Sequence, residues 1–182
     1  MHTIDKVSCI HQALNQGPHY PESELSMSLF RQKWFFLIAI TIAIVAYLCV
    51  VSMRRTRLEE TAVLVPVNLF EQGLSQRNGS EIEASAITGA TFVSMQYGTL
   101  EQMTLQQIAD RIGTGTTHVV ETLHHPVVRI DHDLAEVWAP FEFTIDGKLD
   151  HCGTDSFSLV RNNGKWLIGS LSATLRKECG TP

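Results

Sequence analysis

The sequence predicts an α+β domain, in which N-terminal helices pack on an antiparallel sheet, preceded by a single transmembrane helix. Three observations support this prediction: an uncharged apolar run over residues 34–53, helical periodicity between residues 58 and 112, and strand-like alternation with turn dipeptides from residue 127 onward. Helices followed by a run of strands are typical of a sheet that helices cover on one face. The 182-residue chain is long enough for one such core in addition to a membrane segment.

The apolar run begins at Trp34, and up to Val51 it contains no charge and one strongly polar side chain, Thr41. Its length suits a helix that crosses about 30 Å of hydrocarbon. A globular core helix would show a polar face, and a cleaved signal would be shorter and followed by small residues rather than arginines. We therefore expect a single-pass membrane helix over residues 34–53, after a disordered segment with a basic flank (1–33) and before a basic juxtamembrane collar (54–57).

The flanking charges leave the side of the membrane open. Arg31 and Lys33 precede the run and three arginines follow it between residues 54 and 57, a difference of one charge that by count favours a cytoplasmic domain. Met27 as an alternative start would leave a short basic head whose free amine equalises the flanks. That alternative suits an exported domain.

Charge and cysteine usage restrict the partners of the domain at residues 58–182. This part carries eight Lys and Arg against sixteen Asp and Glu, whereas residues 1–57 carry six against three. An acidic domain repels phosphate backbones, so nucleic acid is not an expected partner. The four cysteines show no metal-binding spacing, and the adjacent His124 and His125 diverge in extended structure. No metal or other cofactor is predicted.

The helical part begins after the collar with apolar residues at spacings of four, three and four: Val63, Val67, Phe70 and Leu74. These residues form one helical face. Pro66 should kink this helix or mark its first turn, and Asn78-Gly79 should end it. A short helix and a strand at residues 91–95 are expected next. Thr104 then caps a helix that ends at Gly113.

From Val127 the chain alternates between polar and apolar residues, with turns after residues 130, 145 and 161. Asp146-Gly147 and Asn163-Gly164 are strong hairpin signals, because both residues of a tight two-residue loop need a positive φ. The sequence therefore predicts a four-stranded antiparallel meander at the C-terminal end of the domain.

Counting residues back from these turns places His151 opposite Glu142 and Arg176, in a row of cross-strand charges on a solvated face. Cys152 would then lie on the other face, so His151 and Cys152 cannot act as a base and a nucleophile. The same register places Cys179 several residues along the sheet from Cys152. A disulfide between them would form only if the C-terminal tail bends back.

Asp155 is the candidate catalytic residue, with His151 as a second candidate. A carboxyl group in partly apolar surroundings tends to have a raised pKa and can act as a general base or a hydrogen-bond donor. The alternative is an aspartate held by backbone or hydroxyl groups. A bulge at Ala139-Pro140 would change the faces in this region, because proline cannot donate to a neighbouring strand. The same register surrounds Asp155 with a candidate ligand-binding set: Trp138, Phe157, Ser170 and Ser172.

The C-terminal stretch AEVWAPFEFTIDGKLDHCGTDSFSLVRNNGKWLIGSLSATLRKEC contains an Asp-Gly turn, His-Cys-Gly, Phe-x-Leu-Val-Arg, Gly-x-Trp and a terminal cysteine. It resembles the nuclear transport factor 2-like superfamily, in particular the SnoaL-like and lumazine-binding-like branch, over residues 58–179 and best over 127–179. The resemblance implies helices closing a strongly curved, cone-like antiparallel sheet with a pocket inside, often in a dimer. Members include ketosteroid isomerases, polyketide cyclases, dehydratases and non-catalytic domains.

Two functions follow from the resemblance. The first is a membrane-anchored domain that binds a small, mostly apolar ligand in its cone, with lyase- or isomerase-type proton transfer through Asp155 as an open possibility. The enzymatic members use an aspartate, or an aspartate and a histidine, but their motifs do not match this sequence residue by residue. The second is a non-catalytic assembly module that forms homodimers or scaffolds partners at the membrane. In its anchor the chain is similar to the bitopic subunits of secretion machines that carry this fold.

Overall fold

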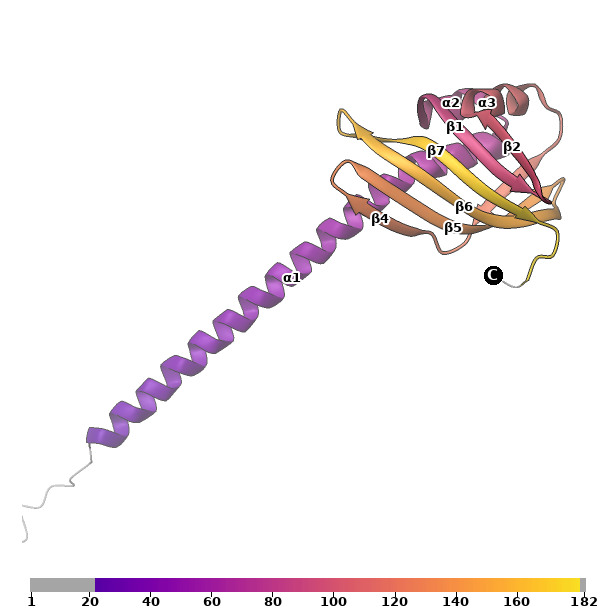
Figure 1. Cartoon of the computed structure of the whole chain (residues 1–182). Helices are drawn as coiled ribbons and strands as arrows, with labels where there is room; N and C mark the ends of the chain where they lie inside the picture. Colours follow the sequence, from indigo (N-terminus) through magenta and orange to yellow (C-terminus); the bar gives the residue numbers. More distant parts are fainter. Residues whose placement is uncertain (1–21, 181–182) are drawn as a thin grey trace, which may run out of the picture. The chain divides into compact units, whose positions relative to one another are not determined.

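The computed structural model describes residues 22–180 and contains helices and strands in the order expected for an α+β chain (Figure 1). The helices are α1 (Glu22–Gln76), α2 (Gly79–Ala84) and α3 (Leu105–Thr114). The strands are β1 (Ala86–Gln96), β2 (Thr99–Thr104), β3 (Val119–Leu123), β4 (Val127–Asp131), β5 (Leu134–Ile145), β6 (Lys148–Asn162) and β7 (Lys165–Arg176).

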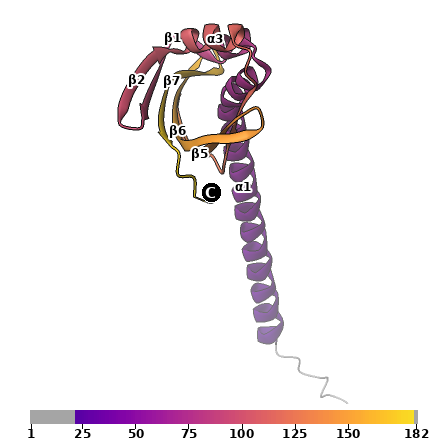
Figure 2. The same ribbon diagram turned by 90° about the vertical axis from the view of Figure 1, so that its right-hand side faces the viewer.

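The strands form one curved sheet with the order β2-β1-β7-β6-β5-β3, and β4 also pairs with β5. The predicted meander is confirmed as β4 to β7. The sheet is mixed rather than antiparallel throughout, because β1 runs parallel to β7. The short strands β2 and β3 have no clear alternation in sequence and were not predicted. From the side, the strands curve around the C-terminal turns of α1 (Figure 2).

The two hairpin turns lie where the sequence predicts them. Asp146 and Gly147 have φ angles of 48° and 75°, and Asn163 and Gly164 have φ angles of 51° and 77°. Both residues of each loop thus adopt the left-handed conformation that a tight hairpin requires. The closing pairs, Ile145 with Lys148 and Asn162 with Lys165, match the predicted register.

Beyond these closing pairs the predicted register is wrong by one residue, because β6 and β7 each contain a bulge. His151 pairs with Phe143 while Leu149 pairs with Thr144, which leaves Asp150 as the extra residue of β6. In β7, Gly169 is the extra residue between the partners of Ser158 and Leu159. The bulge expected at Ala139-Pro140 does not occur.

These shifts change the neighbours of both candidate catalytic residues. His151 lies opposite Phe143 rather than Glu142, and Arg176 lies opposite Cys152. Asp155 lies between Ala139 and Ala173, rather than Trp138 and Ser172. Because side chains alternate along a strand, each one-residue shift moves a whole row of side chains to the other face of the sheet.

The C-terminal part of α1 packs on the inner face of the sheet through the four residues that the periodicity identifies. They are almost fully buried: Val63, Val67, Phe70 and Leu74. They contact a core from β5, β6 and β7, where the ring of Phe157 meets that of Phe70 edge-on at 6.0 Å. Pro66 lies inside α1 rather than at its start. The proline removes the helical hydrogen bond that the carbonyl of Ala62 would otherwise accept.

The other predicted helix boundaries hold closely. Thr104 caps α3 with a reciprocal capping box, in which its hydroxyl accepts from the Gln107 N–H and the Gln107 side chain accepts from the Thr104 N–H. The helix ends at Thr114, one residue beyond the predicted glycine. α1 ends at Gln76, two residues before the predicted stop.

The N-terminal part of α1 contains the apolar run. Within Arg31–Gln76, an 18-residue window has a mean hydropathy of 2.7, and no part of that window is buried. α1 is therefore long and apolar enough to cross a membrane. Residues 22–33 were predicted to be disordered but form the first turns of α1, and the rest of that predicted segment lies outside the described residues.

Cys152 and Cys179 form a disulfide, the outcome that the sequence made conditional on a bent tail. The chain returns toward β6 after β7 ends at Arg176, and the Lys177 ammonium binds the side chain and carbonyl of Asp150 at 3.1 and 3.0 Å. The shifted register also places Cys152 directly opposite Arg176, three residues from Cys179. The disulfide therefore ties the C-terminal tail to the middle of the sheet.

Replacing both disulfide cysteines with alanine should destabilise the domain by about 2–4 kcal/mol, because the bond closes a 27-residue separation in the unfolded chain. Thermal unfolding of the full chain in detergent would measure this. A reducing agent should lower the melting temperature of the wild type equally and leave the double variant unchanged. Cys49→Ala, which removes an exposed free cysteine of α1, is the control. A wild-type melting temperature that ignores the reducing agent would contradict the prediction.

Candidate functional site

A cavity of about 300 Å³ lies on the inner face of the sheet within the domain Met53–Pro182. Its wall is mostly apolar and comes from helices on one side and the curved strands on the other. The larger apolar side chains are Phe70, Phe92, Met103, Phe141, Phe143 and Leu171. The polar side chains are Gln96, Glu101, Arg111, Glu121, His151 and Asp155.

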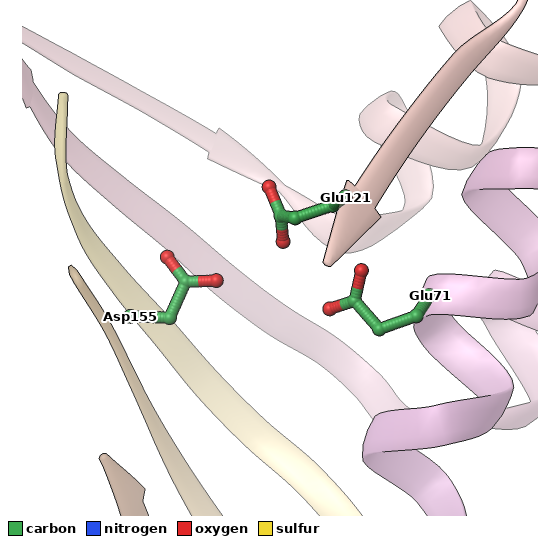
Figure 3. A group of neighbouring side chains, drawn as sticks. All are labelled: Glu71, Glu121 and Asp155. Atoms are coloured by element: carbon green, nitrogen blue, oxygen red, sulfur yellow. The ribbon is translucent and has the colours of Figure 1, made fainter. Parts of the chain in front are cut away.

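Three carboxyl groups meet beside this cavity, one each from α1, β3 and β6. Glu71, Glu121 and Asp155 each offer an oxygen atom that lies within 4.8 Å of the others. Figure 3 shows the three side chains converging on one point from opposite sides. We call these residues the carboxyl cluster.

The carboxyl cluster is removed from water. Asp155 is 2 % exposed, and Glu71 and Glu121 are half-buried as whole residues. Both carboxylate oxygens of Glu71 and the Oδ2 atom of Asp155 are inaccessible and receive no hydrogen bond from an N–H or O–H group in the described chain. A buried acceptor without a donor is costly to fold.

Burial raises the pKa of every member, and repulsion between the carboxyl groups adds to the rise for Glu71 and Asp155. Burial raises the pKa of Glu71 well above its ordinary value, and the charges of Glu121 and Asp155 raise it further. Burial, then the charge of Glu121, raises the pKa of Asp155 well above its ordinary value. The pKa of Glu121 is raised by burial, while interactions with Asp155, Glu71 and His151 oppose that rise. The cluster therefore retains protons at a pH where surface carboxyl groups are ionised.

Such a cluster can perform two kinds of chemistry. A protonated member can donate a hydrogen bond or a proton, while an ionised neighbour accepts one, which is the requirement for general acid–base catalysis. An ionised cluster can instead bind a positive charge, and carboxylate oxygens are also the ligands that hard divalent cations prefer. Perturbed carboxyl groups beside a cavity are typical of functional sites.

His151 lines the same cavity rather than a solvated face, so the predicted charge row through Glu142 and Arg176 is wrong. Its imidazole stacks on Phe143 at 4.6 Å between ring centroids, and its Nδ1 atom lies 2.9 Å from a carboxylate oxygen of Asp150. Hydrogen bonds from His151 and then from Lys177 lower the pKa of Asp150. An ionised Asp150 orients the His151 ring. Cys152 lies on the opposite face, as predicted.

The predicted ligand-binding set is divided by the sheet. Asp155 and Phe157 face the interior, and Phe157 is fully buried in the core. Trp138, at 53 % exposed, and Ser172 pair with Ser156 across the outer face. Ser170 also lies on the outer face, opposite Ser158. The bulges at Asp150 and Gly169 produce this difference, and Phe157 is the one member of the set on the same face as Asp155.

Glu71 and Glu121 were missed, although the sequence contains a signal for both. Glu71 follows Val67 by four residues and precedes Leu74 by three, which places a charge on the apolar face of the helix. Glu121 lies between Val119 and Leu123 at the period of a strand, again at an apolar position. A charged residue at a core position of two separate elements indicates a buried polar site.

Asp155→Asn should raise the melting temperature at pH 8 and have little effect at pH 5. A carboxyl group with a raised pKa holds more protons in the folded than in the unfolded state, so its folded state loses stability as pH rises from about 4 through the raised pKa. The neutral amide removes this loss and can donate to Glu121. We expect the free energy of unfolding of this variant at pH 8 to exceed that of the wild type by about 1–3 kcal/mol, because the variant avoids the usual penalty of an unsatisfied buried group.

Thermal unfolding of both chains between pH 5 and 8 would measure this effect. Asp133→Asn, at an exposed turn position, is the control for the loss of one negative charge. An increase in melting temperature that is equal at both pH values would contradict a titrating Asp155.

No protein-family model matches the sequence, and no curated protein matches it significantly in sequence. The fold, however, is similar to many solved structures. An NTF2-like protein of unknown function from Shewanella baltica is 16 % identical, with a TM-score of 0.54 over 66 % of this chain and 96 % of that one. A nuclear transport factor 2-like superfamily protein from Salmonella enterica serovar Typhimurium is 16 % identical, with a TM-score of 0.55 over 69 % and 96 %.

A third structure, described as a calcium/calmodulin-dependent protein kinase II association domain from Xanthomonas campestris, is 18 % identical, with a TM-score of 0.50 over 62 % of this chain and 84 % of that one. At these identities the likeness concerns the fold. The first two structures match over 96 % of their length. The chain has the fold of the nuclear transport factor 2-like superfamily.

Proposed function

We propose that this domain binds a small, mostly apolar ligand in its cavity and is anchored to a lipid bilayer by residues 34–53. The observation that carries the proposal is a mostly apolar cavity of about 300 Å³ that is lined by Glu121 and by Asp155, whose buried Oδ2 atom has no hydrogen-bond donor. Apolar walls with a few convergent polar groups are the usual form of a small-molecule site. The apolar walls would hold the body of the ligand, and the carboxyl cluster would bind its polar end.

The same arrangement supports proton transfer of the lyase or isomerase type. The pKa of Asp155 is raised toward the pH at which it can both accept and release a proton, and Glu121 offers a second carboxyl group nearby. His151 provides an oriented imidazole in the same wall. Binding does not require this reaction, so catalysis is a separate part of the proposal.

The disulfide supports an orientation in the membrane. Disulfides persist in oxidising compartments and are rare in the cytosol. A bond between Cys152 and Cys179 therefore favours a domain on the non-cytoplasmic side of the bilayer. The flanking charges leave both topologies open, and a start at Met27 would also favour the non-cytoplasmic one.

The alternative is an assembly module that acts through the outer face of the sheet. Large apolar side chains are exposed there, including Trp138 at 53 %, Val127 at 52 % and Met95 at 47 %. Exposed apolar patches of this kind often mark protein interfaces. The similar protein from Xanthomonas campestris is described as an association domain, and a homodimer would be the simplest assembly of this chain.

Native mass spectrometry of the full chain, released from detergent micelles, tests both functions. We expect extra mass that disappears on denaturation, and a lower occupancy in Asp155→Asn, because that variant changes the polar end of the site. Trp138→Ala, on the outer face, is the control and should retain the bound mass. An unliganded species at twice the chain mass that Trp138→Ala dissociates would support the assembly module instead.

A further inference from the structure

We propose that the polar end of the ligand is a cationic amine, which is held by the carboxyl cluster while the apolar body lies along the aromatic walls of the cavity. This inference rests on the proposed function and specifies the chemical class of the ligand. It follows from the charges around the cluster, from the geometry of its acceptors and from the nature of the walls.

Among the residues that the structure describes, no lysine, arginine or histidine forms an ion pair with a member of the carboxyl cluster. Among the described residues that line the cavity, Arg111 and His151 are the two that can carry a positive charge. Arg111 pairs with Glu101 at 3.6 Å, and both side chains are well exposed. His151 is bound through Nδ1 to Asp150, so its interaction with the cluster is limited to a partial compensation of Glu121. A positive charge from a ligand would complete the site.

Three carboxyl oxygens of the cluster, on Glu71 and Asp155, have no hydrogen-bond donor, and the three groups converge from different directions. Asp155 is 98 % buried, and its Oδ2 atom has no hydrogen-bond partner, as is true of both carboxylate oxygens of Glu71. A primary ammonium group carries three N–H donors on one atom, which suits three carboxyl groups around one point. The carboxyl cluster would repel an anionic ligand. A neutral carbonyl group could accept a hydrogen bond from one protonated member of the cluster, but it has no donor to offer to the other two carboxyl groups.

The walls favour an organic cation over a metal ion. Phe92, Phe141 and Phe143 line the cavity, and aromatic faces attract ammonium groups as well as apolar carbon chains. A Mg²⁺ or Ca²⁺ ion prefers six or more oxygen ligands, and the apolar walls add none to the three carboxyl groups. The cavity of about 300 Å³ also provides space that a bare ion would leave empty.

The site should bind an amine more tightly as the pH rises from 5.5 to 8. Burial raises the pKa of each carboxyl group in the cluster, so the cluster gains negative charge at a higher pH than surface carboxyl groups do, whereas an alkylamine remains protonated. The other charged groups around the cavity are His151, Glu101 and Arg111. Arg111 pairs with Glu101, and His151 binds Asp150 through Nδ1, so these groups have partners outside the carboxyl cluster.

Three matched probes would test the proposal on the full chain in lipid nanodiscs by isothermal titration calorimetry: 4-phenylbutylamine, 4-phenylbutan-1-ol and 4-phenylbutyrate. Empty nanodiscs correct for partition into lipid. At pH 8 we expect the amine to bind at least about tenfold more tightly than the alcohol, which corresponds to about 1.4 kcal/mol, and the carboxylate to bind least tightly. Titrations in buffers of different ionisation enthalpy should show proton release on amine binding.

Two variants separate a charge effect from misfolding. Asp155→Asn and Glu71→Gln should each reduce amine affinity about tenfold and leave alcohol affinity within about threefold. Glu136→Gln, on the outer face of β5, is the control and should leave all affinities unchanged. Retained alcohol binding shows that a variant is folded and that its cavity is intact.

The outcomes distinguish this inference from the proposed function. If the alcohol binds as tightly as the amine, or the carboxylate binds best, the amine inference is wrong and the ligand-binding cavity stands. If MgCl₂ or CaCl₂ binds and none of the organic probes does, the cluster is a metal site. If no probe binds and the purified chain carries no extra mass, both proposals are wrong.

Discussion

Gly153→Ala should prevent the domain from folding. A methyl group at this position would overlap the backbone carbonyl oxygen of Thr174 on β7 and lie 2.5 Å from the ring of Phe141 on β5. The backbone of a central strand cannot retreat without breaking its pairs on both sides, and the ring occupies the space that the missing side chain leaves. We expect the free energy of unfolding to fall by more than about 4 kcal/mol, a loss that only severe overpacking of a core reaches.

Limited proteolysis and near-ultraviolet circular dichroism would detect this loss without interference from the helical signal of α1. Gly169→Ala is the matched control on the neighbouring strand, because its methyl group would meet only the Ser158 carbonyl oxygen at an ordinary 3.4 Å. Two variants that resist protease equally would show that β5, β6 and β7 are not packed as described.

Trp166→Ala should destabilise the domain by about 3–5 kcal/mol, the cost of truncating a large aromatic side chain in a core. The indole is 5 % exposed and belongs to the hydrophobic core of the domain. Its outer side is covered by the guanidinium of Arg161, 4.5 Å from the ring. Arg161 also binds Glu59 of α1 at 2.8 Å, so the ring supports an ion pair that joins helix and sheet.

Urea unfolding of the full chain, followed by proteolytic susceptibility, would measure this effect. Trp138→Ala is the matched control, because Trp138 is 53 % exposed on the outer face and its truncation should cost less than about 1 kcal/mol. Equal shifts of the two unfolding midpoints would contradict the assignment of inner and outer faces.

The sequence by itself determined the features that depend on residues close together in the chain. The two hairpin loops, the Thr104 N-cap of α3 and the periodic apolar face of α1 each depend on residues within about four positions of one another, and each was predicted correctly. The long apolar run is also a local feature, and its length and composition make α1 long and apolar enough to cross a membrane. The α+β class followed from the order of these local elements.

Only the tertiary structure decided which distant residues meet. A single extra residue in β6 and another in β7, at Asp150 and Gly169, turned Asp155 toward the interior and left Trp138 outside, and no local preference specified either bulge. The disulfide and the parallel pairing of β1 with β7 likewise join distant segments. The carboxyl cluster depends on the same long-range packing, since its members come from a helix and two strands. Packing across the whole core selects such arrangements, and the sequence around each residue does not encode them.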